Sequence, residues 1–86
     1  MVRVGDNWFV RSRGVPTVTV SRGAAVTWRF VGREPHNVVV KRGPVKFRSG
    51  VERSGTYTRT MRRRGTYTVV CDIHGGRDQK MRLVVR

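Results

Sequence analysis

Apolar residues alternate with polar ones in short runs along most of the chain. Between residues 25 and 30, Val26, Trp28 and Phe30 occupy every second position and polar residues lie between them. This alternation places one set of side chains on the buried face of a β-strand and the other set toward solvent. The same period of two occurs in residues 17–20, 36–41, 56–61, 66–71 and 81–85. The pattern predicts a series of half-buried strands.

Glycines separate these runs at short intervals. They occur at positions 5, 14, 23, 32, 43, 50, 55, 65, 75 and 76. Short runs rich in Val, Thr and aromatic residues, with turn residues between them, are typical of all-β proteins. No window sustains apolar residues at helical spacing. We therefore predict an all-β fold, an antiparallel Greek-key β-sandwich of about seven or eight strands.

The length of the chain limits its organisation. Eighty-six residues are enough for one small domain, so we expect a single domain over residues 1–86. A hydrophobic fraction of 37% favours a packed core over disorder. Cys71 is the only cysteine, which excludes an internal disulfide. No apolar run is long enough to span a membrane, and residues 1–6 lack the pattern of a signal peptide.

The chain is strongly basic, with 19 Lys and Arg, five Asp and Glu, and a formal net charge of +14. Such a field attracts anionic partners, so one hypothesis is a basic β-domain that binds nucleic acid or another polyanion. Small β-domains that bind single strands expose aromatic rings. Here Trp28, Phe30 and Tyr67 point inward by strand parity, and we rank this hypothesis second. Its candidate residues are Arg11, Arg13, Lys41, Arg42 and Arg62–Arg64 for phosphates, and Trp8, Phe9 and Phe47 for stacking on bases.

Two histidines and one cysteine form the constellation that carries chemistry. His36 lies in Pro-His-Asn, and Cys71 precedes His74 by three residues. A thiolate and two imidazoles are the equatorial ligands of a blue-copper site, which a weak axial Met, Gln or backbone oxygen completes. A structural zinc site normally needs four Cys or His ligands, and this chain has three in total. A catalytic Cys–His dyad is disfavoured, because this spacing gives poor geometry and no carboxylate is evident to orient the histidine.

These motifs, in this order, resemble the plastocyanin branch of the cupredoxin family, over nearly the whole chain. The resemblance implies a cupredoxin sandwich that holds one type 1 copper ion through His36, Cys71 and His74. The ring edge of His74 would be exposed for electron entry and exit. It also implies that Asn37 ties the ligand loops together by hydrogen bonds. The matching segments are Val18-x-Val20, Gly23, Val26-x-Trp28, Pro35-His36-Asn37-Val38, Gly65-Thr-Tyr67 and Cys71-x-x-His74.

The axial position departs from the plastocyanin pattern. Plastocyanin-like members most often have Met five residues after the second histidine, where this chain has Gln79. Gln at this spacing resembles the axial ligand of stellacyanin-like cupredoxins. Met81 is the alternative, although its parity with Leu83 and Val85 indicates a core side chain. We favour Gln79, whose amide oxygen is a harder donor than a thioether and should lower the reduction potential.

The resemblance implies outer-sphere one-electron transfer between Cu(I) and Cu(II), and a carrier rather than an enzyme. It also implies a redox partner protein and a periplasmic or extracellular location. The net charge of +14 favours an acidic docking surface on that partner. We expect a monomer. A copper storage or delivery protein is an alternative that the same ligands would serve.

Overall fold

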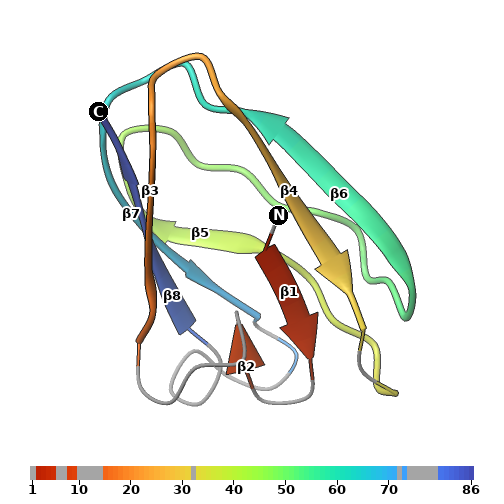
Figure 1. Cartoon of the computed structure of the whole chain (residues 1–86). Coiled ribbons are helices and arrows are strands. Elements are labelled where there is room, and N and C mark those ends of the chain that lie inside the picture. The colour runs from red at the N-terminus through yellow and green to blue at the C-terminus, as the bar shows by residue number, and fades with distance from the viewer. Residues whose placement is uncertain (1, 6–7, 10–14, 32, 72, 74–79) are drawn as a thin grey trace.

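The computed structural model describes residues 2–5, 8–9, 15–31, 33–71, 73 and 80–86. The described residues form eight strands and no helix, in two four-stranded sheets that pack into a sandwich (Figure 1). The first sheet has the order β2 (Trp8–Phe9), β1 (Val2–Gly5), β4 (Ala25–Phe30) and β6 (Gly55–Thr60). The second has the order β3 (Thr17–Val20), β8 (Lys80–Val85), β7 (Gly65–Val70) and β5 (Val39–Arg42). The predicted all-β sandwich is confirmed.

Each sheet also contains one parallel pair of strands, which the sequence did not predict. Strand β1 pairs in parallel with β4, and β3 pairs in parallel with β8, whereas the other pairs are antiparallel. A hairpin cannot join parallel neighbours. Here the chain passes through other strands between the two members of each pair. Alternation along a strand reports which face is buried, and it carries no information on the direction of the neighbour.

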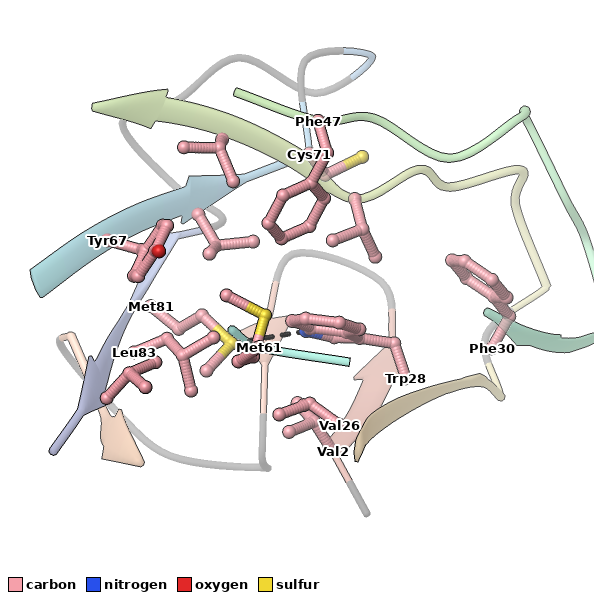
Figure 2. Close-up of a cluster of buried hydrophobic side chains, with 14 residues drawn as sticks. Val2, Val26, Trp28, Phe30, Phe47, Met61, Tyr67, Cys71, Met81 and Leu83 are labelled. Carbon is pink, nitrogen blue, oxygen red and sulfur yellow. Dashed lines mark hydrogen bonds between the residues drawn. The ribbon is translucent and has the colours of Figure 1, made fainter. Parts of the chain in front are cut away.

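Side chains from the inner faces of both sheets form one core (Figure 2). Val26, Trp28 and Phe30 are each at most 4% exposed, as the alternation predicted. The indole Nε1 of Trp28 donates a hydrogen bond to Met81 Sδ across the sandwich, at 3.4 Å. The buried ring therefore keeps a polar partner. The second sheet contributes Val40, Tyr67, Val69, Met81, Leu83 and Val85 to the core.

A segment outside the two sheets carries His36, and backbone hydrogen bonds fasten it. The predicted strand over residues 36–41 begins only at Val39. Before that point, His36 and Glu52 exchange two backbone hydrogen bonds of 2.8 Å each. The backbone N–H of Val38 donates to Ser49 Oγ, and the backbone N–H of Ser49 donates to the carbonyl of Val38, also at 2.8 Å. Residues 36–38 are thereby held without membership of a sheet.

Truncation of a core side chain on β8 should be costly. Leu83→Ala should lower the free energy of unfolding by about 2–5 kcal/mol, because it leaves a cavity between the sheets. Urea denaturation of the two proteins measures this loss. The matched control is Val84→Ala, since Val84 is only partly buried and lies on the other face of the same strand. Equal losses for the two variants would contradict the assigned faces of β8.

Ser49→Ala tests the fastening of the His36 segment. The change removes the side-chain acceptor of the Val38 N–H and should cost about 1–3 kcal/mol. Hydrogen exchange at the Val38 amide should become faster. Ser54 is exposed, so Ser54→Ala should change stability by less than about 0.5 kcal/mol. Unchanged exchange at Val38 in the Ser49 variant would show that the hydroxyl does not hold this segment.

Candidate metal centre

The fold brings two of the predicted metal ligands together. Cys71 directly follows β7, and His36 belongs to the segment between β4 and β5. Both side chains are 0% exposed. The Sγ atom of Cys71 lies 3.8 Å from Nδ1 of His36, although 35 residues separate them along the chain. This pair is the centre of the candidate site.

The distance between Cys71 Sγ and His36 Nδ1 fits a shared metal ion. In zinc sites the metal–thiolate and metal–imidazole bonds are about 2.3 and 2.0 Å long, so two such ligands of one ion lie at most about 4.3 Å apart. The observed 3.8 Å is within this limit. A thiolate sulfur with an imidazole nitrogen is also a donor set that suits copper. These two residues could therefore bind one copper ion.

The other predicted ligands, His74 and Gln79, lie outside the described residues. Within the described part of the chain, no group of three or more His, Cys, Asp and Glu side chains gathers to hold a metal. Asn37, the predicted hydrogen-bonding residue of the ligand loops, is buried next to His36 in the chain. The described structure thus contains half of the predicted four-ligand set.

Met81, the alternative axial ligand, lies in the core between the two sheets. It lies on β8, is fully buried and pairs with Val69 of β7. Its sulfur accepts the hydrogen bond from Trp28, drawn as a dashed line in Figure 2. Met81 is therefore part of the core, as its parity predicted.

Two residues that position His36 were missed at the sequence level. Glu52 pairs with the His36 backbone, and Ser49 holds Val38. The one available signal was the alternation of Phe47 and Ser49, both of which are buried. That signal could indicate a paired segment, but it could not identify the partner.

The triple arginine lies far from Cys71. Arg62, Arg63 and Arg64 are exposed in the turn between β6 and β7. Cys71 follows the other end of β7, whose six residues span about 20 Å at the usual rise of a strand. Figure 1 shows this turn and the end of β7 at opposite ends of the strand. The turn is therefore remote from the candidate metal centre.

The polyanion hypothesis loses one of its stacking residues. Phe47 is only 8% exposed, and the guanidinium carbon of Arg59 lies 4.7 Å from its ring centroid. The prediction that Phe47 stacks on bases is therefore wrong. The side chains of Trp8 and Phe9 lie outside the described residues.

The described part of the chain has no helix that is long and apolar enough to cross a membrane.

Comparison with known proteins finds matches only among solved structures. No family model matches the chain. No curated protein matches it significantly. Two amicyanin variants, one solved in an oxidized form and one in a Cu(I) form, are each 26% identical to this chain, with TM-scores of 0.74 and 0.76. Each match covers 99% of this chain and 79% of the amicyanin chain.

Two further structures are similar at lower sequence identity. A copper-containing nitrite reductase from Thermus scotoductus SA-01 is 21% identical, with a TM-score of 0.78, over 99% of this chain and 21% of its own. A purple cupredoxin from Nitrosopumilus maritimus is 18% identical, with a TM-score of 0.71, over 81% of this chain and 77% of its own. Together with the two mixed sheets around one core, these similarities show that the chain has the cupredoxin fold, as its motifs predicted.

Proposed function

We propose that this chain is a type 1 copper protein that carries single electrons, with His36, Cys71 and His74 as equatorial ligands. The supporting observation is the 3.8 Å approach of the buried Cys71 sulfur to the His36 ring nitrogen. The nitrite reductase and the Cu(I) amicyanin variant, which are similar in fold, are described as copper proteins. Copper held by this donor set would accept and release one electron.

The chain holds the two described ligands rigidly, which suits electron transfer. Strand β7 lies between β8 and β5, so hydrogen-bond ladders on both sides fix the backbone that leads to Cys71. The backbone exchange with Glu52 fixes His36 separately. Ligands that move little between two oxidation states lower the reorganisation energy of each electron transfer. This arrangement needs no group that makes or breaks bonds, so we propose a carrier rather than an enzyme.

Burial protects the thiol of Cys71. A solvent-accessible thiolate is open to oxidation and to exchange with other thiols. The 0% exposure of Cys71 shields its sulfur from both reactions. A single cysteine protected in this way is compatible with an oxidising compartment, which supports the proposal of a periplasmic or extracellular location.

We propose Gln79 as the axial ligand in preference to Met81. The Met81 sulfur already accepts the Trp28 N–H bond inside the core. A move toward the metal centre would leave the buried indole donor of Trp28 without this partner, which carries a desolvation cost. The spacing of Gln79 from His74 is the one that the resemblance requires.

The charge of the chain supports a proposal about its partners. With a net charge of +14, copies of the chain repel one another and attract acidic surfaces. We therefore propose that a monomer, with residues 1–86 as one domain, meets an acidic redox partner. The single core shared by both sheets supports the one-domain assignment.

Copper addition tests the proposed site directly. An equimolar amount of Cu(II) should produce an intense visible band from thiolate-to-copper charge transfer, and the band should be absent in Cys71→Ser. Met81→Leu is the matched control for a buried sulfur and should keep the band. Absorption spectroscopy measures all three proteins. A colourless wild-type protein, or a band that survives in Cys71→Ser, would overturn the proposal.

The reduction potential distinguishes the two axial candidates. Gln79→Met should raise the potential, because a thioether stabilises Cu(I) better than an amide oxygen does. Met81→Leu should leave the potential unchanged and cost less than about 1.5 kcal/mol of stability, as volume-conserving core changes do. Spectroelectrochemical titration gives the potentials. A larger shift in Met81→Leu than in Gln79→Met would assign the axial position to Met81.

A further inference from the structure

A basic pocket of about 350 Å³ lies on the second sheet, where β7 is flanked by β5 and β8. The polar residues that line and define it are Lys41, Arg42, Thr68, Lys80 and Arg82. The volume is within the range of about 300–1,000 Å³ that is common for ligand pockets. All five of these residues are exposed or half-buried, so their polar groups are open to a ligand from solvent.

The register of the strands places a hydroxyl between two guanidinium groups. Thr68 of β7 lies directly opposite Arg42 of β5 on one side and Arg82 of β8 on the other. Residues directly opposite in antiparallel strands point to the same face of the sheet. Neighbouring strands are about 4.8 Å apart, so the backbones of Arg42 and Arg82 lie about 10 Å apart with Thr68 midway. Both arginines can therefore reach a ligand held over the Thr68 hydroxyl.

Two lysines extend this row of residues. Lys80 precedes Arg82 by two residues on β8, so both point to the same face of the sheet. Lys41 is the extra residue at the register shift just before Arg42, and such a bulge re-aims a side chain. The Lys46 ammonium donates to the Lys41 carbonyl, which fixes the backbone of the bulge. The basic pocket thus gathers four cationic side chains around one hydroxyl.

The charge of the basic pocket favours an anion with several oxygens. None of its described lining residues is acidic. Four like charges around one pocket repel one another, and a bound anion would offset this repulsion. Guanidinium groups bind carboxylates and phosphates through paired N–H donors. Because the donors here come from three strands, they approach from several directions, which suits a tetrahedral phosphate better than a planar carboxylate.

We propose that the basic pocket binds a small phosphate-type oxyanion with more than one charge, of the class of diphosphates. Arg42 and Arg82 would donate to its oxygens from two sides, and the Thr68 hydroxyl would donate from the sheet surface between them. The ammonium groups of Lys41 and Lys80 would act as additional point charges. The ligand would therefore need no apolar contact with the protein.

The basic pocket is separate from the candidate metal centre. Cys71 continues the buried face of β7 that carries Tyr67 and Val69, whereas Thr68 points to the outer face. Thr68 also precedes Cys71 by three residues, or about 10 Å along a strand. Binding in the pocket thus requires no copper, and its test is independent of the proposed function.

Titration of the full chain with sodium diphosphate tests the proposal, with calorimetry for affinity and amide NMR for location. Binding should saturate at a single site, with shifts concentrated at residues 41–42, 68 and 80–82. Arg82→Gln and Thr68→Val should each weaken binding by about tenfold, the usual size of a lost hydrogen bond to a charged group. The matched controls are Arg29→Gln and Thr56→Val, which change an exposed Arg–Thr pair on β4 and β6 of the first sheet. Both controls should leave the affinity unchanged.

Three outcomes would overturn the proposal. Equal weakening by Arg82→Gln and Arg29→Gln would indicate diffuse attraction to the whole basic surface. Absence of saturable binding, or unchanged affinity in both pocket variants, would remove the pocket from recognition. Tighter binding of hexaglutamate than of diphosphate, with shifts at the same residues, would reassign the pocket to an acidic protein surface. None of these outcomes depends on copper, so each leaves the proposed function of the metal centre open to its own tests.

Discussion

The burial of one face of β7 between the two sheets is the interaction on which the rest of the structure depends. Tyr67, Val69 and Cys71 follow one another on this face, and all three are fully buried. Hydrogen-bond ladders to β8 and β5 hold the strand on both sides. The same apolar packing that stabilises the sandwich therefore places the Cys71 sulfur at one end of the strand. Toward the other end of the strand, the Tyr67 hydroxyl donates a hydrogen bond to the Arg63 carbonyl in the turn between β6 and β7.

His36 depends on a second and weaker support. Its segment belongs to neither sheet, and two short pairings with residues 49–52 fix its backbone. The two described ligand candidates thus reach the same place from independently held segments. A change in residues 49–52, none of which is a ligand candidate, can shift the ring of His36 while Cys71 stays where β7 puts it. This separation makes the geometry of the site sensitive to residues that do not touch a metal.

The basic composition also has a structural use. Arginines outnumber lysines by 16 to three in this chain. A guanidinium is weakly hydrated and stacks on aromatic rings, whereas an ammonium is strongly hydrated. Arg59 uses this property when its guanidinium covers the ring of Phe47. The self-repulsion of a +14 chain is a cost that such contacts partly offset.

The sequence by itself determined six of the eight strands, their buried faces and the candidate metal ligands, and it did not predict β1 and β2. Alternation is a local property, so the burial of Trp28, Leu83 and Met81 followed from neighbouring residues alone. The rarity of Cys and His limited the candidate ligands to very few residues. The spacing within the cupredoxin motifs then indicated the fold. These conclusions needed no knowledge of the path of the chain.

Only the tertiary structure decided which segments meet. The parallel pairs, the 3.8 Å contact of Cys71 with His36 and the bond from Trp28 to Met81 all join residues that are distant along the chain. The stacking of Arg59 on Phe47 likewise depends on how β6 packs against the segment that carries Phe47. A local period of two indicates which face of a strand is buried, but it does not indicate which residues that face contacts. Those partners are set by the packing of the two sheets as a whole.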